Sequence, residues 1–146
     1  MSESPPRSLS HVLRSTPASA LAAVSAGGAV GASARYGLTA AFPHSTFDVA
    51  TLVANVIGGF LIGSLMVLIT EVYPGSRLIR PFLGVGVLGG FTTFSAYIID
   101  IGRAASGGAT FIAVAFAFTT LAAALLAAAA GMYTTRRFHG RRGATE

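Results

Sequence analysis

The sequence predicts an all-α integral membrane protein with four transmembrane helices. Apolar residues make up 53% of the 146 residues, charged residues only 10%, and the mean hydropathy is +0.69. These values lie far outside the range of soluble domains. The charged residues also leave four long gaps between them. A helix needs about 20 apolar residues to cross roughly 30 Å of hydrocarbon, so each gap has room for one spanning helix.

The gaps place the helices in chain order. They contain 20, 22, 19 and 32 residues, counted between Arg14 and Arg35, Asp48 and Glu71, Arg80 and Asp100, and Arg103 and Arg136. The connecting stretches include PHSTFD and EVYPGSR, which carry Pro and other turn-forming residues. We therefore predict helices at about 18–42, 49–70, 81–101 and 108–133. Because the connections are short, consecutive helices should run antiparallel and form a compact bundle.

The two ends of the chain differ from the apolar region. Residues 1–17 are rich in Ser, Pro and Arg, which predicts a disordered tail, and residues 134–146 are polar and basic, which predicts a second tail at the membrane surface. Eight of the ten arginines fall in these tails or in the loop between the second and third helices. The other two arginines lie toward the opposite side: Arg103 in a loop and Arg35 near the end of the first helix. Arginines collect on the cytoplasmic side, so both termini should be cytoplasmic.

The composition argues against an enzyme. The chain has no cysteine, its three histidines lie outside the apolar stretches, and its five acidic residues lie in tails or at segment ends. No hydrolytic or metal-assisted site can be assembled from them. The arginines are scattered rather than gathered on one face with aromatic residues, which argues against nucleic-acid binding.

Small residues recur four apart in the predicted helices. The pairs are Gly27 with Gly31, Gly59 with Gly63, and Gly86 with Gly90. Such pairs allow helix backbones to approach closely in lipid. They predict tight helix packing and carry no information on function.

Polar residues inside the apolar stretches call for a specific reason. Arg35, late in the first helix, either reaches the interface as an anchor or faces a wet cavity. Asn55 lies about five residues into the second helix, one turn after Thr51. Its carboxamide has two N–H donors, which suit an anion that has lost its water shell. An interhelical hydrogen bond explains Asn55 equally well.

The stretch GVGVLGGFTTFSAY, residues 84–97, combines glycines, hydroxyls and aromatic rings at mid-membrane depth. Unwinding the third helix near Gly89–Thr92 would free backbone carbonyls, which suit a hard cation. Phe94 and Tyr97 are three apart and share a helix face. Their ring edges carry positive partial charge and can line a path for a small anion, although ordinary packing also explains the spacing.

In this order on three helices, GASARY, TLVANVIGGFLIG and GGFTTFSAY resemble the Fluc/CrcB family of fluoride channels. The resemblance covers roughly residues 18–133. It implies an antiparallel, dual-topology type dimer of four-helix subunits in a bacterial-type plasma membrane. Two pores would pass fluoride passively out of the cytoplasm and lower its toxicity. It also implies a structural sodium ion at the dimer centre, which is not transported.

The resemblance assigns roles to individual residues. Arg35 matches the arginine near the aqueous vestibule, and the backbone carbonyls of Gly89 and Thr92 match the sodium ligands. The sequence does not assign pore residues on the fourth helix, where Thr119 and Thr120 are candidates only. The residues that match the fluoride pore are Asn55, Phe94, Tyr97, Ser95 and Thr51.

Three positions depart from the family pattern. The usual F-S-T-F is Phe94-Ser95-Ala96-Tyr97 here, and Gly59 stands where Ser or Thr is usual. The tyrosine hydroxyl would either bind fluoride or narrow the path. The one-sided arginines predict insertion in a single orientation, because opposed identical subunits need a near-zero bias. The partner should then be an oppositely oriented paralogue, and otherwise a second copy.

Two other functions compete with a conducting subunit. A non-conducting partner subunit of a heterodimeric fluoride channel is favoured by the altered F-S-A-Y element. A small multidrug transporter is also a short four-helix chain, but export of cations coupled to protons needs a carboxylate inside the membrane. The first helix has none.

Overall fold

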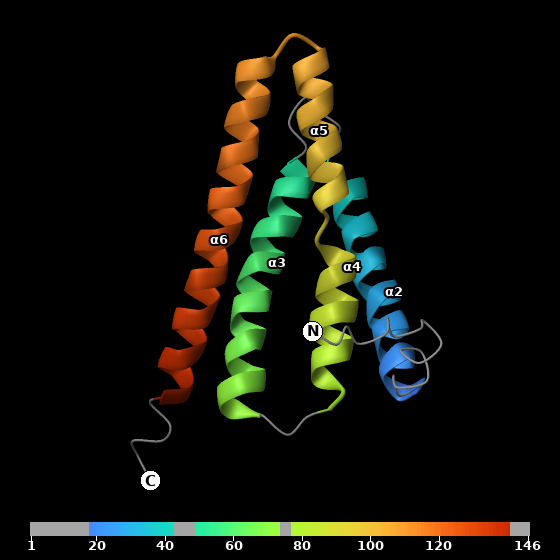
Figure 1. Ribbon diagram of the computed structural model, residues 1–146, viewed down its shortest axis with the longest axis vertical. Coiled ribbons are helices and arrows are strands. Elements are labelled where there is room, and N and C mark those ends of the chain that lie inside the picture. Colours follow the sequence, from blue (N-terminus) through green and yellow to red (C-terminus); the bar gives the residue numbers. More distant parts are fainter. Residues whose placement is uncertain (1–17, 43–48, 74–76, 141–146) are drawn as a thin grey trace, which may run out of the picture.

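The computed structural model describes residues 18–42, 49–73 and 77–140, and these residues form a bundle of long helices (Figure 1). The all-α fold class is therefore confirmed. The first and second helices are α2 (Ala18–Ala41) and α3 (Val49–Val67), and α3 continues into the π-helical turn η1 (Leu68–Val72). The third consists of η2 (Arg80–Leu88), α4 (Gly89–Phe91) and α5 (Phe94–Ser106), and the fourth is α6 (Thr110–Gly140).

Three helical stretches of the described residues are long and apolar enough to cross a membrane. They are Val49–Val72, Arg80–Ser106 and Thr110–His139. The first helix, α2, has 24 residues but is built mainly from Ala, Gly and Ser and contains Arg35. These residues are much less apolar than Leu, Ile or Phe. Three of the four predicted spans are thus supported by length and composition, and the first stays a prediction.

The fourth helix ends later than the sequence predicts. Residues 134–140 were expected in the basic tail but form the last turns of α6. This stretch contains neither Gly nor Pro before Gly140, and Arg136 makes an ion pair with Glu71 of η1, with Nε 2.8 Å from Oε1. The expected tail at 1–17, the loop at 43–48 and residues 141–146 lie outside the described residues.

The third helix is broken at Thr92 and Thr93. Their backbones are extended, with φ and ψ of −79° and 156° at Thr92 and −148° and 124° at Thr93. The predicted window of Gly89–Thr92 includes only the first of these residues, and Gly89 and Gly90 remain helical. The break therefore lies at the C-terminal end of the predicted window, at the threonines and not at the glycines. Thr93 starts the next helix as its N-cap, because its hydroxyl accepts a hydrogen bond from the amide of Ala96 at 3.2 Å.

Glycines bring the helices into backbone contact, as the small-residue pairs predict. A Cβ added at Gly27 or Gly31 of α2 would lie 2.3 or 2.0 Å from a carbonyl oxygen of η2. The same holds between α3 and α6, where a Cβ on Gly63 would lie 2.1 Å from the Ala128 carbonyl oxygen. The bundle thus pairs α2 with η2 and α4, and α3 with α6 (Figure 1). The break in the third helix lies beside both α2 and α3.

Candidate functional site

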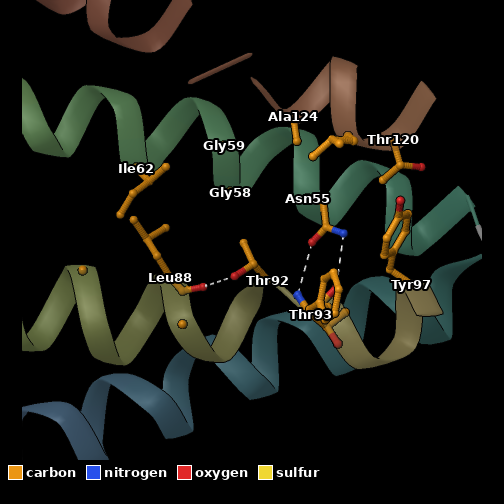
Figure 2. Close-up of a pocket in the computed structure, with 14 residues that line it drawn as sticks. Asn55, Gly58, Gly59, Ile62, Leu88, Thr92, Thr93, Tyr97, Thr120 and Ala124 are labelled. Atoms are coloured by element: carbon orange, nitrogen blue, oxygen red, sulfur yellow. Dashed lines mark hydrogen bonds between the residues drawn. The ribbon is translucent and has the colours of Figure 1, made fainter. Parts of the chain in front are cut away.

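A pocket of about 390 Å³ lies beside the helix break. Figure 2 shows side chains from α3, the third helix and α6 around it. Most of the wall is Gly, Ala, Leu and Ile, and a few polar or aromatic groups interrupt it. Such a wall, apolar with few placed polar groups, is typical of ligand sites. The polar and aromatic lining residues are Asn55, Thr92, Thr93, Phe94, Tyr97 and Thr120.

Asn55 holds the break open by pairing with the backbone of Thr93. Its Nδ2 donates to the Thr93 carbonyl at 3.2 Å, and the Thr93 amide donates to its Oδ1 at 3.1 Å (Figure 2). We call this pair of hydrogen bonds the Asn55 clasp. It gives a partner to the Thr93 amide, which leaves the helix pattern at the break. A carboxamide has two N–H donors, so one remains for another partner.

Two backbone carbonyls at the break lose the amide partners that a continuous helix would give them. In a continuous helix the Gly89 carbonyl would accept from the Thr93 amide, and the Thr92 carbonyl from the Ala96 amide. The first amide donates to Asn55 and the second to the Thr93 hydroxyl. Gly89 is exposed, and a Cβ there would meet no atom within 4 Å. The two carbonyls named as sodium ligands are thus released from the helix pattern, one of them on an open face.

The Arg35 side chain, from α2, contacts the third helix at α4, just before the break. It is half-buried, and its Nε donates to the Gly90 carbonyl at 3.1 Å. This bond satisfies a third carbonyl near the break. A cation at this end also offsets the negative end of the helix dipole. Arg35 does not line the pocket.

A row of aromatic rings joins α5 to α6. The ring centroids of Phe94 and Tyr97 are 5.8 Å apart, and those of Tyr97 and Phe116 are 6.1 Å apart. Phe94 is 75% exposed, whereas Phe116 is buried. The Tyr97 hydroxyl donates to the Ala117 carbonyl of α6 at 2.8 Å. Its single proton is therefore committed to that carbonyl and is not free for an anion.

The remaining predicted residues lie near the pocket but do not line it. Thr51 is buried one turn before Asn55. Ser95 is exposed, with its hydroxyl 3.3 Å from that of Thr93. The sequence interpretation missed Thr93 and Phe116. A Thr before a new helical stretch is a capping signal, but nothing local marks Phe116, because its partners come from another helix.

Comparisons with known proteins agree with this architecture. The sequence profile of a family described as "CrcB-like protein, Camphor Resistance (CrcB)" matches residues 22–132. A Streptomyces avermitilis protein named "Fluoride-specific ion channel FluC 3" is 44% identical over 124 residues, which are 84% of this chain and 61% of that protein. A second protein of that organism, "Fluoride-specific ion channel FluC 2", is 45% identical over 69% of this chain and 65% of its own length.

The chain therefore spans a little under two thirds of these two Streptomyces relatives. A Thermobifida fusca protein, also named "Fluoride-specific ion channel FluC 2", is covered more fully. It is 52% identical over 122 residues, which are 79% of this chain and 88% of that protein. With a profile match over most of its length and relatives at this identity, the chain belongs to the CrcB/FluC family, which is a family of fluoride-specific ion channels and not of enzymes.

Proposed function

We propose that this chain is a subunit of a fluoride-specific ion channel that passively exports cytoplasmic fluoride and so lowers its toxicity. The observation that carries the proposal is the pocket at the helix break, where a carboxamide N–H and aromatic rings interrupt an apolar wall. The names of the relatives support the same ion. Thr51 and Ser95 would be polar positions along the ion path. Arg35 would lie near the aqueous entrance of that path.

The physical logic of the pocket suits a small anion. Removing water from an ion carries a large penalty unless fixed donors replace the lost hydrogen bonds. The free N–H of Asn55 is such a donor, and the ring edges of Phe94 and Tyr97 carry positive partial charge. These groups are neutral, so they replace water without holding the ion tightly. A conducting path needs both properties.

We also propose that a structural sodium ion sits at the break. Hard cations take several oxygen ligands, and the carbonyls of Gly89 and Thr92 are oxygens whose usual amide partners are engaged elsewhere. When bound, the cation adds positive potential beside an anion path. Two carbonyls are too few for a complete shell. A second chain would supply the rest, which supports a dimer with the exposed face of Gly89 at its centre.

The partner in that dimer is best explained as an oppositely oriented paralogue. Eight arginines lie in the predicted tails and second loop and only one or two toward the other side. Such a bias favours one orientation in the membrane. Streptomyces avermitilis carries at least two related proteins, numbered 2 and 3, so paralogues occur together in this family.

Fluoride efflux from liposomes tests the function. Liposomes that contain the purified chain, alone and with a candidate paralogue, are loaded with potassium fluoride or potassium chloride. Valinomycin starts the efflux, and an ion-selective electrode records it. We expect fluoride to leave at least about a hundred times faster than chloride, since a fixed set of donors discriminates by several kcal/mol. Equal rates for the two anions would refute the proposal.

Tagging the C-terminus tests the orientation. With a reporter that is active on only one side of the membrane, we expect almost all of the signal on the cytoplasmic side, because of the arginine bias. The matched control is a variant in which the four arginines of residues 134–146 are changed to Gln, which should shift part of the population to the other side. An even split for the unaltered chain would exclude an obligatory heterodimer.

A non-conducting partner subunit is the second candidate. The Tyr97 hydroxyl donates its only proton to the Ala117 carbonyl of α6, so it is not free to bind an anion, and this favours the second candidate. Efflux from a heterodimer would then survive Asn55→Asp in this chain and fail only when the other chain is changed. A small multidrug transporter needs a carboxylate in the first helix, and α2 has no acidic residue.

A further inference from the structure

Thr92, the first residue of the break, is held on both branches of its side chain. Its hydroxyl donates to the Leu88 carbonyl at 2.8 Å, and its amide donates to the same oxygen at 2.9 Å. A threonine with its hydroxyl fixed also has its methyl group fixed, because both are attached to Cβ in a staggered rotamer. Figure 2 shows the Thr92 side chain between Leu88 and Gly58 of α3.

Gly58 has no side chain at the point where the methyl group of Thr92 meets α3. The residue is buried, and a Cβ added to it would lie 2.1 Å from the Thr92 Cγ2. The next nearest atoms, the Thr92 Cβ and the Phe91 Cδ1, would lie 3.6 and 3.8 Å away, which is ordinary contact. We call this gap the Gly58 notch. One methyl group fills it, and that group alone stands in the way of a larger residue at position 58.

Helix α3 therefore holds both extended residues of the break. Asn55 and Gly58 are three positions apart and share a face of α3. Asn55 binds the amide and the carbonyl of Thr93, and Gly58 receives the methyl group of Thr92. The peptide group that joins Thr92 to Thr93 lies between these two points.

This peptide group contains the Thr92 carbonyl, which is one of the two proposed sodium ligands. A peptide group is planar, and in its trans form the N–H and the C=O point in opposite directions. The described residues contain no cis peptide bond. Because the Thr93 amide donates to Asn55, the Thr92 carbonyl is directed away from α3. The notch fixes the Thr92 end of this plane, and the Asn55 clasp fixes the Thr93 end.

We propose that Gly58 is a positioning residue for the sodium ion, and that it acts through the Thr92 methyl group on the direction of the Thr92 carbonyl. The inference rests on the proposed sodium site and deepens it by naming the part of α3 that fixes one ligand. Residues that orient a metal ligand without touching the metal commonly change metal affinity by about 10–100-fold. The cation site and the anion pocket then depend on one helix, because Asn55 and Gly58 both line the pocket.

Gly58→Ala tests the inference by adding a methyl group to an occupied notch. Thr92 must then turn its side chain, which breaks the bond to Leu88, or shift its backbone, which redirects its carbonyl. The readout is the thermal unfolding temperature in detergent, measured as sodium chloride replaces choline chloride at constant ionic strength. We expect the sodium concentration that gives half of the maximal shift to rise at least about tenfold.

A swap of the two methyl groups shows whether the notch is the cause. Thr92→Ser removes the methyl group and keeps the hydroxyl, so it leaves the notch empty. In the double variant Gly58→Ala with Thr92→Ser, the alanine methyl group takes the vacated space, with its remaining neighbours at 3.6 and 3.8 Å. We expect the double variant to regain most of the lost sodium affinity, so that the two effects do not add.

Gly63→Ala is the matched control, with the same change on the same helix. Its added Cβ would lie 2.1 Å from the Ala128 carbonyl oxygen of α6, outside the pocket lining. We expect this variant to unfold at a lower temperature in both salts and to keep the half-maximal sodium concentration of the unaltered protein. A general loss of packing is thereby separated from a loss of cation binding.

Failure of the inference is distinguishable from failure of the proposals on which it rests. If the unaltered protein shows a sodium-dependent shift and Gly58→Ala keeps its midpoint, the inference is overturned and the sodium site stands. A loss of affinity that the double variant does not restore also overturns it. If the unaltered protein shows no sodium-dependent shift, both the inference and the site are overturned, and fluoride efflux still decides the channel function.

A comparison of two other variants covers the case in which Gly58→Ala does not fold. The notch is empty in Thr92→Ser and filled in the double variant, while the serine hydroxyl is common to both. We expect the double variant to bind sodium more tightly than Thr92→Ser. Equal sodium affinities of these two variants would overturn the inference.

Discussion

Asn55→Asp is expected to reduce fluoride efflux at least about a hundredfold, since it converts donors into repulsive acceptors in an apolar pocket. One aspartate oxygen still accepts from the Thr93 amide. The other replaces Nδ2 and faces the Thr93 carbonyl, 3.2 Å away in the unaltered protein, where two oxygens repel. The free N–H on the pocket wall is lost as well. The clasp and the anion path should therefore fail together.

The liposome assay measures this loss, and thermal unfolding in detergent measures the cost to the fold. We expect the unfolding free energy to fall by about 1–3 kcal/mol, as for a buried group left without its partner. Ser64→Ala is the matched control. It removes another bond from the same helix, from the Ser64 hydroxyl to the Gly131 carbonyl at 3.3 Å, outside the pocket lining. A folded Asn55→Asp protein with unaltered efflux would show that the clasp is dispensable.

Gly31→Ala is expected to disrupt the packing of α2 against the third helix. The added Cβ would lie 2.0 Å from the Val87 carbonyl oxygen and 2.9 Å from the Phe91 amide nitrogen. Both are backbone atoms, so one helix must move as a whole. Overpacking of this kind costs about 1–3 kcal/mol or more. Because Arg35 lies one turn further along α2, the same movement should break its bond to Gly90 and lower efflux.

Samples are heated to a series of temperatures and run on size-exclusion chromatography. The quantity measured is the temperature above which the monodisperse peak is lost. Gly28→Ala is the matched control on the same helix, because a Cβ there meets no atom within 4 Å. Alanine is a better helix former than glycine by about 1 kcal/mol, so this variant should be as stable as the unaltered protein or slightly more so. Equal stability of the two variants would contradict the packing derived from the structure.

The sequence was sufficient for the membrane class and for most of the helices. Transfer of apolar side chains into lipid depends on composition, and the spacing of charges limits where a helix can span. The glycine pairs also predicted the close helix contacts, because residues four apart share a face of any helix. The motif around Asn55 and Phe94 identified the family from residues that are local in the chain.

The details of the site were decided by partners that are distant in sequence. The sequence placed the break near Gly89–Thr92, where two glycines lower the local helix propensity, yet Gly89 and Gly90 stay helical and Thr92 and Thr93 leave the helix. The reason is the clasp, which joins Asn55 to a residue 38 positions later. A helix opens where another helix supplies replacement hydrogen bonds, and local propensity does not encode that supply.

The difference between local patterns and distant partners also separates the other features of this protein. The sequence by itself determined a bundle of apolar helices with glycine contacts and a broken third helix, because burial in lipid and helical periodicity act locally along the chain. Only the tertiary structure decided that Arg35 bonds the Gly90 carbonyl, that Tyr97 reaches Ala117, and that the Thr120 hydroxyl is left on the pocket wall. Each of these depends on which helices meet, and that follows from packing of the whole bundle.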